Sequence, residues 1–85
     1  IMRYVEFDPA KDLANIAKHG VSLARAAELE ILVVIEDERF SEQCYRIYGL
    51  LDGAPLCLAA TLRNGIVRAI SLRRAHSKEF RRHVP

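Results

Sequence analysis

The alternation of apolar and polar residues predicts where the strands of this chain lie. Residues 3–7 alternate and are rich in strand-forming residue types, which predicts a first strand. Residues 31–35 are a run of Ile, Leu and Val, which predicts a second strand, and the acidic residues 36–38 that follow predict a solvated loop. Three further strands are predicted over residues 45–51, 54–62 and 66–72.

Helix signals flank these strands at both ends of the chain. Asp8 followed by proline is a strong helix start, because the carboxylate accepts from free backbone N–H groups and the proline gives up a donor that the helix would not use. Gly20 suits the left-handed residue that ends a helix, so a first helix is predicted over residues 9–19. Ser22 can cap a second helix, and the basic stretch after Leu72 predicts a short C-terminal helix.

Two dipeptides predict tight hairpin turns that fix the register of the last three strands. Asp-Gly occupies positions 52–53 and Asn-Gly occupies positions 64–65, and both favour two-residue turns. Directly opposed residues share a face of the sheet. One predicted face is mixed and basic, with Cys44, Arg46, Tyr48, Cys57, Ala59, Thr61, Arg63, Ile66, Arg68, Ile70 and Leu72. The other is almost free of charge, with Tyr45, Ile47, Gly49, Leu56, Leu58, Ala60, Leu62, Val67, Ala69 and Ser71.

These two faces predict how the sheet is covered. The uncharged face should pack on the N-terminal helices and leave the arginine-bearing face open. The chain is therefore predicted to be an α+β protein: a small antiparallel β-sheet meander with N-terminal helices packed on one face and a short C-terminal helix. Its length supports one domain with one modest core, over residues 2–85. Ile1 precedes Met2, at which a natural reading frame is expected to begin.

Composition and cysteine content narrow the class of protein. Apolar residues make up 51% and charged residues 28% of the chain, which is typical of a globular protein. No apolar run approaches the roughly 18 residues that cross a bilayer, and charged residues near the N-terminus argue against a signal peptide, so a cytoplasmic protein without a membrane partner is expected. Cys44 and Cys57 are expected to be free thiols, and we expect neither a metal site nor a cofactor.

The net charge of +2 conceals a strong asymmetry. Residues 63–85 hold seven basic residues against one acidic residue, whereas residues 1–62 hold six basic against ten acidic residues. Such a split predicts a polyanion or an acidic protein as the partner of the C-terminal third. A solvated basic helix is the alternative interpretation.

Arginines on the predicted open face are the first candidates for chemistry. The predicted register brings Arg46, Arg63 and Arg68 to one surface, with Thr61 between the last two. A guanidinium group matches phosphate oxygens with two parallel hydrogen bonds, so such a cluster suits a phosphodiester better than lysines would. A merely solvated face is the competing interpretation.

Several short blocks follow one another in order along nearly the whole chain. The first blocks are Glu6-Phe7-Asp8-Pro9 with Lys11, then Asn15 and Lys18-His19-Gly20-Val21. The later blocks are Arg46 with Gly49, Thr61 with Arg63, Arg68-Ala69-Ile70-Ser71-Leu72-Arg73-Arg74-Ala75, and Glu79. In this order the blocks resemble the BrnT family of bacterial type II toxins. The resemblance implies an RNA-cutting toxin with a RelE-like fold, which arrests growth and is neutralised by a BrnA-like antitoxin with a DNA-binding ribbon-helix-helix domain. DNA would be a partner only through that antitoxin.

The sequence departs from the family pattern at four positions. Phe7 stands where the family usually has tryptophan, and His83 stands near an expected tyrosine. Tyr45 and Leu62 each stand where the family usually has an acid beside an arginine. The two missing acids leave the assignment of acid and base roles open.

Metal-independent cleavage of RNA uses the 2′-hydroxyl as nucleophile, so the protein must position a phosphate, stabilise negative charge and transfer two protons. Arginine can serve the first two needs, but it stays protonated. We expect catalytic contributions from Arg63, Arg73, Thr61, Glu79 and His76. We expect further RNA contacts from Arg46, Arg68, Arg74 and Lys18.

Several of these residues also have simpler explanations. Lys18 and His19 suit the negative end of a helix, and Glu79 can pair with Arg81 or Arg82 along a helix surface. A rival function is therefore a non-catalytic or degenerate module that binds nucleic acid or a partner protein through its basic face.

Overall fold

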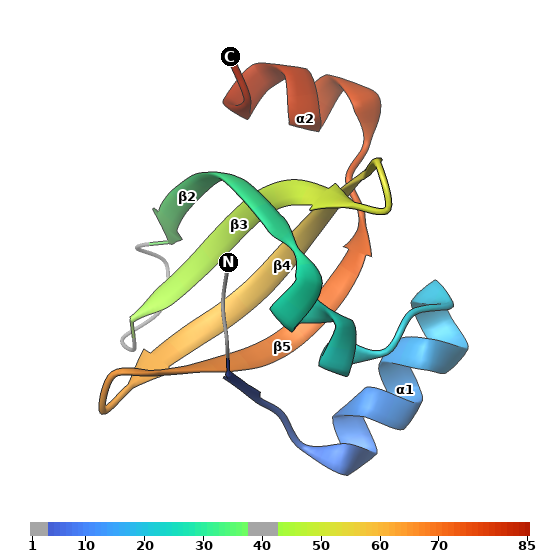
Figure 1. Cartoon of the computed structure of the whole chain (residues 1–85), viewed down its shortest axis with the longest axis vertical. Coiled ribbons are helices and arrows are strands. Elements are labelled where there is room, and N and C mark those ends of the chain that lie inside the picture. The colour runs from blue at the N-terminus through green and yellow to red at the C-terminus, as the bar shows by residue number, and fades with distance from the viewer. Residues whose placement is uncertain (1–3, 38–42) are drawn as a thin grey trace.

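Residues 4–37 and 43–85 are the part of the chain that the computed structural model describes, and their element order follows the sequence pattern. The elements are β1 (Val5–Glu6), α1 (Pro9–His19), the 3-10 helix η1 (Leu23–Glu28), β2 (Glu30–Asp37), β3 (Cys44–Leu51), β4 (Ala54–Arg63), β5 (Ile66–Arg74) and α2 (Ser77–His83) (Figure 1). The differences from the prediction lie in helix type, in element ends and in the register of one strand pair.

Within the described residues the strands form one mixed sheet in the order β1-β5-β4-β3-β2. Neighbours from β2 to β5 are antiparallel, which confirms the predicted meander and the α+β class. β1 adds a parallel strand at the β5 edge, where Val5 pairs with Val67 and Glu6 with Arg68. Of the predicted strand over residues 3–7, β1 comprises Val5–Glu6, and the chain turns into α1 after Glu6. Residue 3 lies outside the described residues.

The ends of α1 confirm both predicted helix signals. The Asp8 carboxylate accepts from the backbone N–H of Ala10 at 2.8 Å, and proline opens the helix. Gly20 adopts a left-handed φ of 74°, and its N–H donates to the carbonyl of Ile16 at 2.8 Å. Residues 9–19 are therefore helical, as predicted.

The second predicted helix is a short 3-10 helix. The Ser22 hydroxyl caps it by accepting from Ala24 N–H at 3.1 Å, as predicted. Asp12 of α1 accepts from the Leu23 N–H at 2.7 Å and from the Ser22 hydroxyl at 3.0 Å, which ties the two helices together. η1 has six residues and is followed by Leu29, which is fully buried and leads directly into β2. A segment this short can form a 3-10 helix, which is wound more tightly than an α-helix.

Both hairpin turns have the backbone conformation that their sequences predict. Asp52 and Gly53 have φ values of 52° and 80°, and Asn64 and Gly65 have values of 53° and 75°. Two successive positive φ values define the tight turn that matches the twist of antiparallel strands. The predicted pairing of β3 with β4 is confirmed along its whole length.

A β-bulge changes the register of β4 and β5 after the second turn. The pairing shifts by one residue between Ala59 and Ala60, which leaves Ile70 without a partner in the register. Beyond Ile70 the faces of β5 are therefore reversed relative to the prediction. Leu72, predicted on the basic face, is fully buried in the core, and Ser71 lies on the basic face instead.

The same bulge decides where Arg73 points. Arg73 pairs with Cys57, so its side chain shares a face with Cys57 and with Tyr48, which is also opposite Cys57. An uninterrupted register would have placed Arg73 on the apolar face. β5 also continues through Arg74, two residues beyond the predicted end of the strand.

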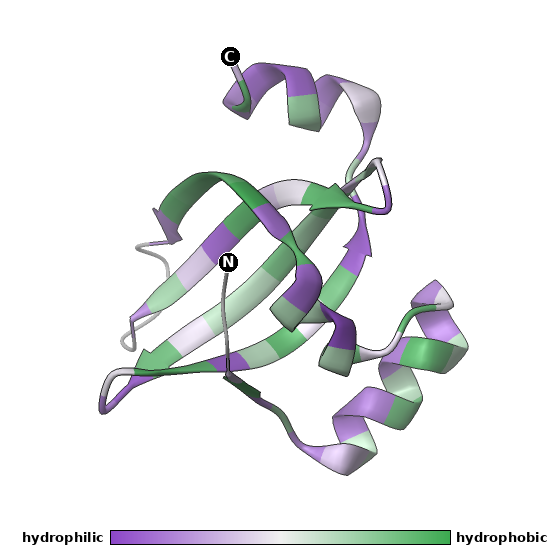
Figure 2. Cartoon of the chain, viewed as in Figure 1, coloured by the Kyte–Doolittle hydropathy of each residue, from purple (hydrophilic) through white to green (hydrophobic). Residues whose placement is uncertain are grey.

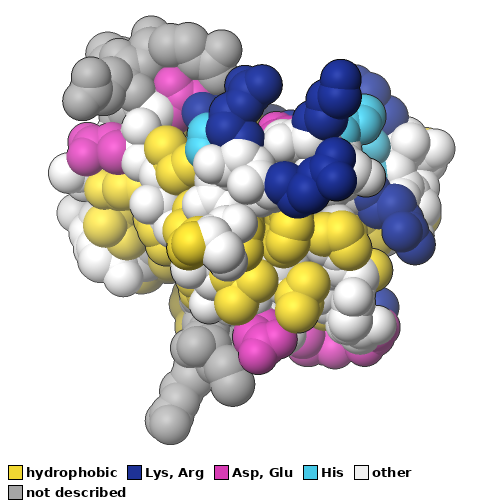
Figure 3. All heavy atoms as spheres, turned by 90° about the horizontal axis from the view of Figure 1, so that it is seen from above, with side chains coloured by type: hydrophobic (Ala, Val, Ile, Leu, Met, Phe, Trp, Pro, Cys, Tyr) yellow, Lys and Arg dark blue, Asp and Glu magenta, His cyan; other side chains and the backbone are white. Residues whose placement is uncertain are grey.

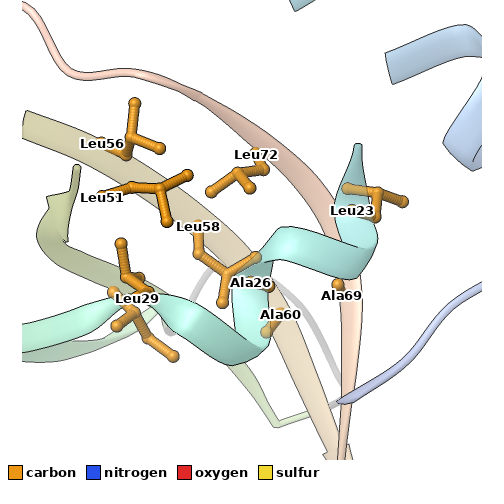
Figure 4. Close-up of a cluster of buried hydrophobic side chains, with 10 residues drawn as sticks. Leu23, Ala26, Leu29, Leu51, Leu56, Leu58, Ala60, Ala69 and Leu72 are labelled. Atoms are coloured by element: carbon orange, nitrogen blue, oxygen red, sulfur yellow. The ribbon is translucent and has the colours of Figure 1, made fainter. Parts of the chain in front are cut away.

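The main core lies between η1 and the uncharged face of the sheet (Figure 4). Its buried members are Leu23, Ala26, Leu29, Ile47, Leu51, Leu56, Leu58, Ala60, Ala69 and Leu72. Figure 2 shows the corresponding concentration of hydrophobic residues along the central strands, while α2 is mostly hydrophilic. The predicted packing of N-terminal helices on this face is confirmed for η1, whereas α1 contributes none of these buried side chains.

Asn15 fixes α1 against the edge of β5. Its side-chain amide donates to the Leu72 carbonyl at 2.9 Å, and its side-chain oxygen accepts from the Leu72 N–H at 3.1 Å. It also donates to the Val21 carbonyl at 2.9 Å, and the residue is only 5% exposed. The amide thus bonds to Leu72 as a neighbouring strand would, beyond the point where β1 ends.

The acidic segment after the second predicted strand is not a solvated loop over its first two residues. Glu36 and Asp37 belong to β2, and Asp37 is buried opposite Cys44. Pairing with β3 extends the strand past the apolar run, because backbone hydrogen bonds do not require apolar side chains. Glu38, the third acid of the predicted loop, lies outside the described residues.

α2 covers one end of the face that was predicted to be open. Tyr48, Cys57 and Ala75 form a second buried cluster, against which Phe80 and Val84 pack. Figure 1 places α2 at one end of the molecule and α1 at the other. The arginine-bearing face is therefore enclosed at the α2 end, and the residues between β5 and α2 come close to Tyr48.

Candidate active site

An arginine–glutamate pair links β5 to α2. Arg73 donates from Nη1 to Glu79 Oε1 and from Nη2 to Glu79 Oε2, both at 2.9 Å. The side chains are 31% and 19% exposed respectively, so the pair is partly shielded from water and remains reachable. Glu79 had been expected to pair with Arg81 or Arg82, but the bulge in β5 brings Arg73 to it instead.

Two further side chains extend this pair across the sheet. The Tyr48 hydroxyl donates to Glu79 Oε2 at 2.8 Å, and Arg46 Nη1 donates to the Tyr48 hydroxyl at 3.4 Å. We call Arg46, Tyr48, Arg73 and Glu79 the Glu79 network. Its members come from β3, β5 and α2, so it forms only in the folded protein.

Helix α2 presents Glu79 to the network from its first turn. The backbone N–H of His76, the residue before the helix, donates to Glu79 Oε1 at 3.3 Å. A carboxylate at this position satisfies one of the free N–H groups at the helix start and lies near its positive end. The sequence Ser77-Lys78-Glu79 therefore sets both the helix start and the direction of the carboxylate.

Hydrogen bonds and burial shift the pKa values of the network. The two hydrogen bonds from Arg73 lower the pKa of Glu79 to about 2, against an ordinary value of 4.5. Burial, and then the hydrogen bond to Glu79, raise the pKa of the Tyr48 hydroxyl well above its ordinary value. At neutral pH the network therefore holds a carboxylate, a neutral phenol and guanidinium groups.

Arg46 carries an unsatisfied donor inside the network. Among the side chains that the structure describes, Arg46 Nε is buried without a hydrogen-bond acceptor. A buried donor without a partner costs on the order of 1–3 kcal/mol. Such groups cluster at functional sites, because a fold selected for stability alone would replace them.

Aromatic contacts hold α2 over this end of the face. The His83 ring stacks on Tyr48 with ring centres 5.1 Å apart and planes 20° apart. Phe80 meets the same ring edge-on at 6.4 Å. His83 therefore belongs to the wall of the site, and its stacking on Tyr48 is a role that the sequence did not indicate.

The arginines predicted to share one face do share it, but they form two groups. Arg46 belongs to the Glu79 network, whereas Arg68 donates to Glu6 at 2.6 Å and lines a hollow of about 150 Å³ with Arg63. Thr61 pairs with Arg68 and lies in this second group. Arg63 lies six positions along β4 from Cys57, the partner of Arg73, so Arg63 and Arg73 lie about 20 Å apart along the strand. Arg46 pairs with Ala59 and therefore lies between the two.

Of the remaining predicted residues, Lys18 lies beside the network and Arg74 does not. Arg74 pairs with Leu56, so it points to the opposite face of the sheet from Arg73. Lys18 and Arg73 line a common hollow between α1 and β5. Figure 3 looks onto the α2 end of the molecule and shows Lys, Arg and His side chains gathered over it.

Tyr48 is the functional candidate that sequence reasoning missed. The predicted register placed Tyr48 on the basic face, but it ended the last strand at Leu72 and assigned Arg73 to the C-terminal helix, so nothing brought the two together. The signal that could have found Tyr48 is a tyrosine on the same predicted face as Arg46 and Cys57, since a phenol that becomes buried needs a hydrogen-bond partner. The position of α2 shows that this partner is Glu79.

Both cysteines of the described residues carry free thiols. Cys44 and Cys57 are free, as predicted, and burial raises the pKa of the Cys57 thiol. Over residues 4–37 and 43–85, no group of three or more His, Cys, Asp or Glu side chains is placed to hold a metal ion. In the same residues, no helix is long and apolar enough to span a membrane.

Comparisons with known proteins identify the family. Searches of curated proteins and of solved structures gave no significant match. A family model described as the ribonuclease toxin BrnT of type II toxin-antitoxin systems matches residues 7–79. That span runs from the residue before Asp8 to Glu79 and contains every residue of the Glu79 network. The chain therefore belongs to the BrnT family of ribonuclease toxins of type II toxin-antitoxin systems.

Proposed function

We propose that this toxin is a metal-independent endoribonuclease that cuts RNA at the Glu79 network and so arrests growth. The observation that carries the proposal is the double hydrogen bond between Arg73 and Glu79, joined by Tyr48 to Arg46 on one partly exposed surface. It combines a phosphate-binding cation with a group that can accept a proton.

Arg73 and Arg46 supply the positive charge of the proposed site. The scissile phosphate lies against Arg73, whose planar guanidinium can bind one phosphate oxygen while it keeps a bond to Glu79. Negative charge increases on the phosphate as the 2′-oxygen attacks, and fixed guanidinium groups stabilise that charge. Burial of part of Arg46 strengthens the effect, because less water screens it.

Glu79 is the proposed general base for the 2′-hydroxyl. Its pKa of about 2 makes it a weak base in the free protein. A bound phosphate adds a second negative charge beside the carboxylate and competes for Arg73, and both effects raise the pKa of Glu79. Substrate binding itself therefore brings the base closer to working strength, while the Tyr48 hydroxyl keeps the carboxylate in position.

The second proton goes to the leaving 5′-oxygen. His76 is the proposed acid, because its backbone contacts Glu79 and its side chain is exposed beside the site. His83, stacked on Tyr48, is the alternative acid. Thr61, Arg63 and Arg68 are proposed to contact the strand away from the cut, and Lys18, which lines a hollow with Arg73, is proposed to contact it next to the cut. Arg74 points to the opposite face of the sheet and takes no part in this proposal.

Partner and location follow from the family as further proposals. A type II system implies an antitoxin partner, which is proposed to be BrnA-like. The ribbon-helix-helix domain of this antitoxin would bind DNA, so the toxin would be linked to DNA only through the antitoxin. The toxin is proposed to act as a single RelE-like domain over residues 2–85 in the cytoplasm, where its RNA substrate lies.

One observation favours a non-catalytic alternative. The Glu79 carboxylate already accepts four hydrogen bonds, from Arg73 twice, from Tyr48 and from the His76 backbone. On this alternative, the role of the fully bonded carboxylate is to fasten α2 to the sheet. In that case the basic face binds nucleic acid or a partner protein without cutting.

Cleavage in the presence of EDTA tests the proposal. Wild-type protein is expected to cut RNA in EDTA, and Arg73→Lys is expected to cut it on the order of 100-fold more slowly, because lysine keeps the charge but loses the two-pronged bond. Arg25→Gln is the control, since Arg25 pairs with Glu28 and Asp52 on the far side of the core. RNA that is bound but left intact would favour the non-catalytic alternative.

A further inference from the structure

A hollow beside the Glu79 network has the shape of a second binding site. It has a volume of about 360 Å³ and lies between α1 and β5. Helical spacing directs five residues of α1 toward it, because positions three, four, seven and eight apart share one side of a helix. Its lining residues are Lys11, Ala14, Asn15, Lys18, His19, Ile70, Ser71 and Arg73.

The hollow is lined by basic residues, and no Asp or Glu is among its lining residues. The basic residues are Lys11, Lys18 and Arg73. Arg73 is already paired with Glu79, but in the described part of the chain Lys11 and Lys18 are exposed and neither makes an ion pair. The two lysines repel each other, so an anion placed between them gains from both.

Helix stability explains Lys18 but not Lys11. Lys18 lies in the last turn of α1, where a cation stabilises the negative helix end. Lys11 lies in the first turn, where the same dipole disfavours a cation by about 0.3–1 kcal/mol. Lys11 therefore weakens α1, which points to a role for this lysine other than helix stability.

The walls of the hollow are held in place by buried contacts. Asn15 bonds twice to Leu72, which fixes the distance between α1 and β5. Ile70, the extra residue of the bulge, lies in the wall between them. A hollow with such walls needs little rearrangement to accept a ligand.

We propose that this hollow binds the backbone phosphate next to the scissile one on a single strand of RNA. Arg73 is shared between the hollow and the Glu79 network, so one strand passing over Arg73 places one phosphate at each. Lys11 and Lys18 contact the non-bridging oxygens of the second phosphate, which positions the strand without reading its bases. The inference rests on the proposed function and gives that site its substrate orientation.

Binding of an uncleavable oligonucleotide tests the hollow separately from catalysis. A short RNA with 2′-O-methyl groups throughout lacks the nucleophile, so only binding is measured, by fluorescence anisotropy at several salt concentrations. Lys11→Gln with Lys18→Gln is expected to bind about tenfold more weakly at low salt, and to lower the dependence of log affinity on log salt by about 0.7, because both lysines contact the same phosphate. Lys11→Arg with Lys18→Arg is expected to restore both.

Matched controls separate this site from general charge effects. Arg25→Gln removes one positive charge, as Lys18→Gln does, but from a residue already paired with two acids, and it is expected to bind like wild type. Equal binding of the oligonucleotide by Lys18→Gln and Arg25→Gln overturns the inference.

Two other results also overturn it. One is failure of wild type to bind the oligonucleotide. The other is a double lysine variant that loses antitoxin binding but keeps RNA binding, which would assign the hollow to an acidic protein segment. Lysine-dependent binding without any cleavage of ordinary RNA would instead retain the hollow and reject the catalytic proposal.

Discussion

Arg73 meets Glu79 because β5 contains one residue more than the strand it pairs with. The bulge at Ile70 turns the Arg73 side chain away from the apolar face and toward the first turn of α2, where Glu79 accepts both of its hydrogen bonds. Bulges are often found next to active sites, where they redirect a side chain. The bulge leaves Ile70 unpaired, and by redirecting Arg73 it brings together the residues of the Glu79 network.

Truncation of Leu72 tests the bulge directly. Leu72 is fully buried after the register shift, so Leu72→Ala is expected to lower the free energy of unfolding by about 2–5 kcal/mol. An uninterrupted register would leave this side chain on the basic face, and the substitution would then cost little. Urea unfolding measures the difference, with Ile66→Ala on the exposed end of the same strand as the control.

Loss of the Asn15 side chain is expected to detach α1 from β5. Asn15→Ala removes three hydrogen bonds and leaves the N–H and carbonyl of Leu72 without partners in a buried place, which is expected to cost about 2–4 kcal/mol. Leu13→Ala on the exposed side of α1 is the control and is expected to change stability by less than about 0.5 kcal/mol. Similar losses for both variants would contradict the clamp.

Stability at low pH is expected to depend on Glu79. A carboxylate with a lowered folded-state pKa stabilises the fold above its unfolded-state pKa and loses that contribution as the pH falls through the folded-state value. For Glu79 this range runs from pH 4.5 down to about 2. Wild type is therefore expected to be more stable than Glu79→Gln at pH 7, with the difference shrinking across that range. Unfolding free energies that stay parallel down to pH 2 would contradict the strength of the Arg73–Glu79 pair.

Local signals made much of the fold predictable, because they act through a few adjacent residues. Asp8 and Gly20 set the ends of α1, and the Asp-Gly and Asn-Gly turns set the hairpins, each by a conformational preference that does not depend on distant parts of the chain. The six-residue η1 was less predictable, because its length depends on where β2 begins after the buried Leu29.

The site was harder to predict, because the bulge arises from tertiary packing. No residue type in β5 indicates the bulge, since Ile70 is an ordinary strand-forming residue. The extra residue reverses the faces of β5 beyond it, and β5 also continues through Arg74, whereas the predicted strand ended at Leu72, so the prediction gave Arg73 no position beside Tyr48. Membership of the basic face was right for Arg46, Arg63 and Arg68, which lie before the bulge or on other strands.

Single-turnover cleavage by two matched variants tests the central claim most directly. Glu79 and Glu6 each pair with an arginine on the same face of the sheet, but only Glu79 belongs to the Glu79 network. With an RNA substrate in EDTA at pH 7, Glu79→Gln is expected to cut at least about 100-fold more slowly than wild type, as loss of a general base requires, whereas Glu6→Gln is expected to keep most of its activity. Equal rates for Glu79→Gln and wild type, or an equal loss in both variants, would contradict the assignment of the cleavage site to the Glu79 network.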